Sequence, residues 1–100
     1  MVDAPRWSQR ARNDLKAIHD RIAQDSPLNA KAVTSAFLQR AVEIPTTPRA
    51  GRIVPEFGDP NIREVPVHSW RLIYQLRQEN VFVVALVHKR RRSPARQLRD

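Results

Sequence analysis

Apolar and polar side chains alternate along the second half of the chain in the manner of β-strands. Between Trp70 and Arg77 every second position is a large apolar residue, and the intervening positions are polar apart from Ile73. A period of two predicts a strand with one covered face. Val81–Val87 is apolar throughout, which predicts a strand covered on both faces. The polar residues Arg77–Asn80 predict a hairpin loop between these strands, and Ile62–Val67 is predicted to add a third strand beside them.

A longer period, close to that of an α-helix, marks the first half of the chain. Ser8 is a residue type favoured as a helix N-cap. The apolar residues that follow it at helical spacing are Ala11, Leu15, Ile18 and Ile22. The pattern predicts an amphipathic helix of about four to five turns that ends near Gln24–Asp25.

Ser26 and Pro27 predict the start of a second helix, because serine caps a first turn and proline is tolerated at the first helical position. The apolar stripe of this helix consists of Ala30, Val33, Phe37, Ala41 and Ile44, with Leu38 beside it. The helix should end at Ile44–Pro45, since the residue before proline disfavours the helical conformation. Two amphipathic helices joined by a few residues predict an antiparallel helical hairpin.

The remaining strands are short and contain prolines. Val2–Trp7 and Ile53–Phe57 are predicted to be edge strands, because proline has no N–H to give to a neighbouring strand. Gly58–Asn61 has the composition of a turn. Gly51, in the connector before these residues, is interpreted as a position whose backbone conformation other residues avoid.

Counted without the short segment Ile53–Phe57, these elements predict the order β-α-α-β-β-β. The fold class is therefore α+β, with a helical hairpin packed on one face of a small antiparallel sheet. We expect four side chains from the helices and the sheet to converge in one core: Leu15, Phe37, Leu72 and Val84.

Length and composition narrow the class of protein. A chain of 100 residues has room for a single domain with one modest core. It has no apolar run long enough to cross a bilayer and no features of a secretory signal. The absence of cysteine excludes disulfides, a thiolate nucleophile and a cysteine-based zinc site. The three histidines share no close spacing, so we expect no metal site. We also expect no cofactor. A small protein that stands without disulfides is expected to work in a cytoplasm.

Positive charge is concentrated at the C-terminus. The formal net charge is +8, and residues 89–100 carry six cationic side chains against one acidic side chain. Most of the cations are arginines, whose planar guanidinium suits both carboxylates and phosphates. A basic terminal run is either a disordered, solvated tail or a segment that folds on an acidic partner. We therefore divide the chain into a domain over residues 1–90 and a basic tail over residues 91–100.

Short motifs follow one another along the chain in a distinctive order. They are Trp7-Ser8, Ala11, Asp14-Leu15, Ser26-Pro27 with Ala30, Pro48–Arg52, Pro55-Glu56, Ile62–Val65, Trp70–Tyr74 and Val87–Arg90. In this order and spacing the chain resembles the ParE branch of the ParE/RelE toxins, the toxic halves of type II toxin–antitoxin pairs. The resemblance covers residues 7 to about 91.

This resemblance implies a function and partners. It implies a cognate antitoxin, ParD-like or similar, whose C-terminal segment docks along the helical hairpin and the sheet edge to form a hetero-oligomer. ParE-like toxins serve plasmid maintenance and poison DNA gyrase by binding, whereas RelE-like toxins cleave mRNA in the ribosome. We expect the gyrase activity, because the lysine pair and terminal tyrosine typical of the RelE branch have no counterpart here. A third alternative, from charge alone, is a small basic nucleic-acid-binding module whose tail does the binding.

The RelE alternative assigns catalytic roles to specific residues. Cleavage of RNA needs a base for the ribose 2′-hydroxyl, cations for the phosphate and an acid for the leaving oxygen. The candidates for these roles are Glu56 as the base, Arg63 and Arg71 as the cations and His88 as the acid or base. Glu56 and Arg63 also have a structural interpretation as ion-pair partners, and His88 has one as a strand-terminal residue bonded to backbone.

Binding, in contrast, needs only a cationic surface. The residues predicted to bind the target or the antitoxin are Arg49, Arg52, Arg63, Arg71, Lys89, Arg90 and Arg91. Within this set, Arg63 and Arg71 are expected to share a basic patch that Arg49 and Arg52 extend.

Overall fold

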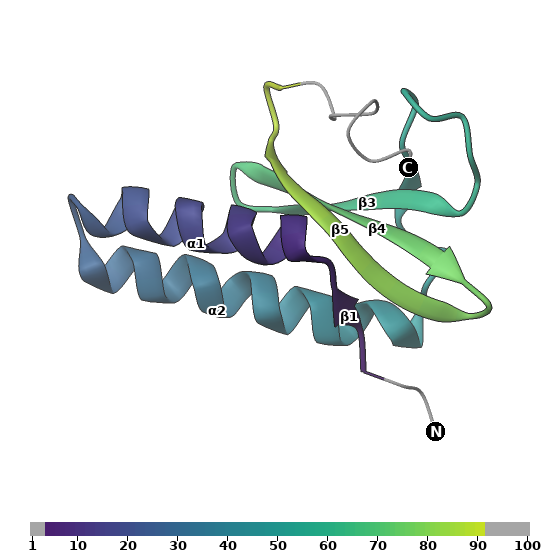
Figure 1. The fold of residues 1–100 in the computed structure, drawn as a ribbon, viewed down its shortest axis with the longest axis horizontal. Helices are drawn as coiled ribbons and strands as arrows, with labels where there is room; N and C mark the ends of the chain where they lie inside the picture. The colour runs from purple at the N-terminus through teal and green to yellow at the C-terminus, as the bar shows by residue number, and fades with distance from the viewer. Residues whose placement is uncertain (1–3, 92–100) are drawn as a thin grey trace.

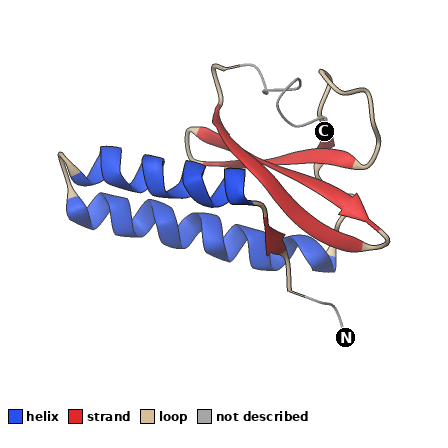
Figure 2. Ribbon diagram, in the orientation of Figure 1, coloured by secondary structure: helices blue, strands red, loops and turns tan. Residues whose placement is uncertain are grey.

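The computed structural model describes residues 4–91, which form a layer of helices and a layer of sheet (Figure 1). The elements in chain order are β1 (Arg6–Trp7), α1 (Gln9–Ala23), α2 (Pro27–Glu43), a 3-10 turn η1 (Ile44–Thr46), β2 (Arg52–Ile53), β3 (Ile62–Val67), β4 (Trp70–Arg77) and β5 (Asn80–His88). The two helices run side by side and cover one face of the sheet (Figure 2). The predicted α+β class, a helical hairpin on a small sheet, is confirmed. Val2–Asp3 of the predicted first strand, and residues 92–100 of the predicted tail, lie outside the described residues.

Both helices begin where the sequence predicts, and α1 is also tied to the sheet. The Ser8 Oγ accepts the N–H of Ala11 at 3.0 Å, and the Ser26 Oγ accepts the N–H of Asn29 at 3.1 Å. The same Ser8 hydroxyl donates to the carbonyl of Val84 in β5 at 3.1 Å. One and a half turns later, Asp14 Oδ2 accepts the N–H of Leu86 at 3.0 Å. These contacts satisfy the edge of β5 beyond the short β1.

The sheet is mixed, with the strand order β1-β5-β4-β3-β2. Strands β2 to β5 are antiparallel neighbours, as predicted, but β1 pairs in parallel with β5. The expectation of a wholly antiparallel sheet is therefore wrong for β1, because two helices separate it from the other strands and return the chain to the far edge. The strand predicted over Ile53–Phe57 is also too long, since the N–H groups of Phe57 and Gly58 bond back to the Val54 carbonyl in a turn. With β2 counted, the order is β-α-α-β-β-β-β.

The main core lies between the helices and the sheet. Leu15, Phe37 and Leu72 meet there, as predicted. Val84 does not, because a bulge sets Tyr74 opposite Val83 but Ile73 opposite Ala85, so that Val84 packs on the other face of the sheet. The prediction that all four residues converge is therefore wrong for Val84.

A smaller apolar cluster occupies the outer face of the sheet, away from the helices. Its buried members are Val54, Phe57, Ile73, Ala85 and Val87. The loop after β2 supplies the first two, so β5 is covered on both faces, as its apolar sequence predicts. Among residues 4–91, no helix is both long and apolar enough to cross a bilayer.

Candidate functional site

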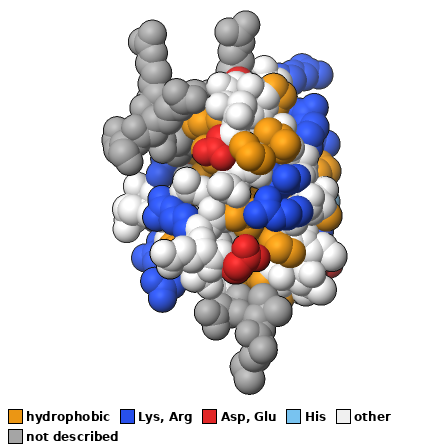
Figure 3. Space-filling view, turned by 90° about the vertical axis from the view of Figure 1, so that its right-hand side faces the viewer, with side chains coloured by type: hydrophobic (Ala, Val, Ile, Leu, Met, Phe, Trp, Pro, Cys, Tyr) orange, Lys and Arg blue, Asp and Glu red, His pale blue; other side chains and the backbone are white. Residues whose placement is uncertain are grey.

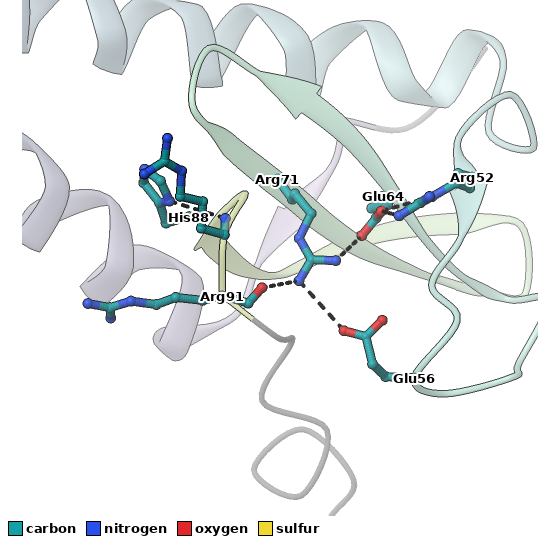
Figure 4. Close-up of polar contacts among 7 residues, drawn as sticks. Arg52, Glu56, Glu64, Arg71, His88 and Arg91 are labelled. Atoms are coloured by element: carbon teal, nitrogen blue, oxygen red, sulfur yellow. Dashed lines mark hydrogen bonds and ion pairs between the residues drawn. The ribbon is translucent and has the colours of Figure 1, made fainter.

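A buried carboxylate on the outer face of the sheet is held between two arginines (Figure 4). Glu64, in β3, has a side chain only 6 % exposed. Its Oε1 accepts a hydrogen bond from Arg52 Nε at 3.0 Å, and its Oε2 accepts one from Arg71 Nη1 at 2.8 Å. A carboxylate removed from water to this extent requires such partners. Arg52 and Arg71 are therefore both engaged by the carboxylate of Glu64.

Arg71 joins three segments of the chain through this network. Besides Glu64, its Nη2 lies 3.6 Å from Glu56 Oε2 and donates to the carbonyl of Arg91 at 2.8 Å. The side chain is 12 % exposed. Figure 4 shows the guanidinium turned toward the two glutamates, with Arg91 on its other side. The network therefore fixes the loop that carries Glu56 and the point where the chain leaves β5.

Arg63 lies on the opposite face of the sheet from Arg71. It pairs with Tyr74, a member of the core beneath the helices, whereas its neighbour Glu64 points outward. Its guanidinium donates to the carbonyls of Arg49, Gly51 and Pro60, each at 2.9 Å. The basic patch predicted for Arg63 and Arg71 does not form, because adjacent positions in a strand alternate between faces and Arg71 lies on the outer one.

His88 stands at the end of β5 and is bonded to backbone. Its Nδ1 accepts the N–H of Arg90 at 3.2 Å, and its ring forms a T-shaped contact with the Trp70 ring, with centroids 6.0 Å apart. Trp70 packs against the core beneath the helices, so His88 lies on that side of β4. Glu56 instead faces Arg71 on the outer side (Figure 4). The four residues considered for catalysis are thus divided between the two faces.

Gly51 is required by a close approach rather than by an unusual backbone angle. A Cβ at this position would overlap the Tyr74 hydroxyl and would lie 3.0 Å from the Glu64 carbonyl oxygen. The left-handed glycine of the described region is instead Gly58, with φ +62°. Tyr74 is fully buried and donates its hydroxyl to the Pro48 carbonyl at 2.6 Å. Burial raises the pKa of Tyr74 above its ordinary value of 10.0.

The cations that follow β5 are placed differently. Lys89, Arg90 and Arg91 are exposed, and within residues 4–91 the Lys89 and Arg90 side chains form no ion pair or hydrogen bond. Arg49 is also exposed, although its carbonyl is held by Arg63. On the face shown in Figure 3, lysines and arginines are spread among apolar and acidic side chains rather than gathered in one field. Of the residues predicted to bind a partner, the ones with exposed side chains are therefore Arg49, Arg52, Lys89, Arg90 and Arg91.

An apolar groove at the start of α1 was not found from the sequence. It has a volume of about 710 Å³, and its apolar lining is Pro5, Trp7, Leu15, Leu38 and Phe82. Three cations, Arg6, Arg12 and Arg77, surround it, and the last lies over the Phe82 ring at 4.8 Å from the centroid. Leu38 is 47 % exposed. The sequence signal was Leu38 itself, an apolar residue beside the main stripe of its helix.

Comparisons with known proteins place this fold. A family model described as the ParE toxin of the type II toxin–antitoxin system parDE matches residues 6–93. The chain belongs to this family. Among solved structures, the chromosomal ParDE toxin–antitoxin system from P. aeruginosa has a similar chain, with a TM-score of 0.71 and 14 % identity over 87 % of this chain and 96 % of that one. A mutant of the E. coli toxin RelE in complex with an antitoxin RelBc peptide gives a TM-score of 0.62 and 18 % identity over 97 % and 94 % of the two chains. No curated protein matches the chain.

The protein is therefore the toxin of a type II toxin–antitoxin system, with a fold shared by ParE and RelE. In this toxin, the described residues contain no group of three or more metal-ligating side chains. The outer face carries carboxylates and guanidiniums that neutralise one another. The Arg71 Nε is buried there without a hydrogen-bond partner. Elsewhere on the described residues, the apolar groove and the exposed cations after β5 are surfaces that a partner could cover.

Proposed function

We propose that this toxin inhibits growth by binding DNA gyrase in the cytoplasm, without chemistry of its own. The observation that supports this proposal is that the Arg71 guanidinium is already surrounded by protein groups. A cation that stabilises a transferring phosphate must be free to face it, whereas this guanidinium is enclosed by Glu64, Glu56 and the Arg91 carbonyl. Arg63 lies on the other face, and its three carbonyl contacts give it a structural role.

The acid–base pair of a nuclease is also not assembled. Glu56 faces Arg71, while His88 packs on Trp70 and accepts a backbone N–H with Nδ1. A general base must reach the proton it removes, directly or through one water. Binding to gyrase requires only an exposed surface, and Lys89, Arg90 and Arg91 supply its cations, with Arg49 as a further exposed one.

Neutralisation by a cognate antitoxin forms the second half of the proposal. The apolar groove offers anchor positions, and its three arginines suit the acidic residues of a docking segment. Because Leu38 comes from α2, Leu15 from α1 and Phe82 from β5, such a segment would span the helical hairpin and the sheet edge. The expected assembly is a hetero-oligomer of toxin and antitoxin.

The experiment measures supercoiling by purified gyrase and the accumulation of cleavage complexes as toxin is added. Toxin carrying Glu56→Gln should inhibit gyrase as well as the unaltered toxin. The substitution weakens the 3.6 Å ion pair with Arg71, but Arg71 keeps its bonds to Glu64 and to the Arg91 carbonyl. A nuclease that used Glu56 as its base would lose about 10²–10⁴-fold in rate. Codon-specific cuts in ribosome-bound mRNA that disappear with Glu56→Gln would contradict the proposal.

The same assay tests the antitoxin. The protein encoded beside the toxin should restore supercoiling. Leu38→Glu should raise the antitoxin concentration needed by about tenfold or more, since it places a charge where the docked antitoxin would bury an apolar side chain. Leu28→Glu is the matched control, because Leu28 lies on the same helix, is 77 % exposed and does not line the groove. Equal effects of the two substitutions would remove the groove as the docking site.

A further inference from the structure

A hollow of about 410 Å³ lies where the β3–β4 turn meets the end of β5. It is lined by His68, Ser69, His88, Lys89 and Arg90, and we call it the cationic cup. The Lys89 N–H donates to the Ser69 carbonyl at 2.8 Å, which continues the β4–β5 pairing beyond Trp70 and His88. The five side chains are therefore carried by a braced backbone.

The ring of His88 lines the cup and has one nitrogen left to donate a hydrogen bond. Its Nδ1 accepts the Arg90 N–H, which places the ring proton on Nε2. A T-shaped contact with the Trp70 ring restrains the orientation of the His88 ring. With the Ser69 hydroxyl, the Lys89 ammonium and the Arg90 guanidinium, the cup combines four kinds of donor.

The positive charge of the cup is not balanced locally. No Asp or Glu lines it, and within the described part of the chain neither Lys89 nor Arg90 has a side-chain partner. The carboxylates that line the two neighbouring hollows, Glu64 and Asp14, are already bonded to other groups. The cup therefore retains charge and donors for an external anion.

The lining distinguishes between classes of anion. A docked peptide needs apolar pockets for alternate side chains, and those pockets lie in the apolar groove, which shares no residue with the cup. Cationic and hydroxyl donors without apolar anchors are what phosphate contacts use. In sequence, Arg91 and Arg92 follow directly, so that cations continue beyond the cup as a polyanion requires.

We propose that the cationic cup binds phosphates of a nucleic-acid backbone, without reading base sequence. This inference concerns the toxin itself and does not depend on gyrase being the target. It also differs from binding by the basic tail alone, because it assigns the contact to Ser69, His88 and the two cations beside them.

The test measures binding of a short DNA duplex to the full-length toxin over a range of salt concentrations. Each phosphate contact adds about 0.9 to the magnitude of the negative slope of log affinity against log salt. The double substitution Lys89→Gln with Arg90→Gln should reduce this magnitude by about 1.8. The matched control is Arg21→Gln with Lys31→Gln, which removes the same charge from exposed helix positions and keeps the tail intact. The control should leave the slope unchanged, and equal slopes for the two double variants would overturn the proposal.

Magnetic resonance of the labelled toxin locates the contact without any substitution. Both inorganic phosphate and the duplex should shift the amide signal of Ser69 and the ring signals of His88, the duplex at much lower concentration. Shifts confined to residues 92–100 would overturn the proposal. If phosphate and the duplex reach half-saturation at the same concentration, the ligand is free phosphate. If a polyglutamate peptide displaces the duplex at equal salt, the ligand is an acidic protein segment. Either outcome would also overturn the proposal.

Discussion

The outer face of the sheet and the cationic cup lie on neighbouring stretches of the same strands, yet they treat positive charge in opposite ways. On the outer face, Arg52 and Arg71 share Glu64, and the Arg71 side chain is only 12 % exposed. In the cup, Lys89 and Arg90 are exposed and have no side-chain partner within the described residues. A guanidinium that leaves water needs carboxylates or carbonyls around it, whereas an exposed cation is solvated and needs none.

This difference determines what each region contributes. Arginines held by buried carboxylates stabilise the fold and position loops, and they are not available to a ligand. Cations without partners produce a positive potential at the surface, which attracts anionic ligands. The number of arginines in a sequence therefore does not locate the binding surface; the carboxylates that the fold brings to each arginine do.

Removing Glu64 should have the largest effect on this contrast. Glu64→Ala leaves Arg71 mostly buried with Glu56 at 3.6 Å as its remaining carboxylate, and we expect a loss of about 3 kcal/mol in the free energy of unfolding. Lys89→Ala, its counterpart in the cup, should change this free energy by no more than about 0.5 kcal/mol. Urea denaturation of the two variants measures both values. Similar losses in the two would show that the paired and unpaired regions do not differ energetically.

Gly51→Ala should have the next largest effect, because it disturbs the connector that carries Arg52 to Glu64. The added methyl would overlap the Tyr74 hydroxyl, and neither the buried ring nor the Glu64 backbone can withdraw freely. Overpacking of this kind costs about 2 kcal/mol. Gly58→Asn is the control, since Gly58 faces open space and asparagine tolerates its positive φ. If thermal unfolding shows Gly51→Ala to be as stable as the control, the connector is looser than these contacts indicate.

The elements predicted correctly depend on local signals. Serine caps and an alternation such as that of Trp70–Arg77 act within a few residues. They led to the helical hairpin and the three long strands. The proline signal was less exact, because α2 ends at Glu43, Ile44 keeps helical angles, and the chain passes through Pro45 as a 3-10 turn. The resemblance to ParE then gave the family, which the match over residues 6–93 shows.

The errors arise where pairing partners are distant in sequence. A bulge within an unbroken apolar run leaves no pattern, so the outward turn of Val84 was not visible. The parallel pairing of β1 with β5 joins two segments that are more than seventy residues apart, and no local pattern records it. Arg63 and Glu64 alternate faces as any neighbours in a strand do, but only the register with β4 shows that Arg71 lies with Glu64. The apolar groove was missed for the same reason, since β1, both helices and β5 contribute to it.

The smallest expected effect concerns Tyr74, which ties the connector to the sheet. Tyr74→Phe removes the hydrogen bond to the Pro48 carbonyl and should cost about 1 kcal/mol near neutral pH. Burial raises the pKa of Tyr74 in the folded protein above the ordinary value of 10.0. The stability that comes from its neutral form is therefore complete below pH 10.0 and is lost as pH rises through the folded pKa. The unaltered toxin should lose this contribution at alkaline pH, while Tyr74→Phe has none to lose, so the difference in unfolding free energy between them should shrink.

Tyr74 is the single tyrosine of the chain, so phenolate absorbance follows its ionisation directly. A difference that stays constant as the phenolate forms would mean that the hydroxyl is not enclosed, and that the connector beside Glu64 is as open to water as the cationic cup.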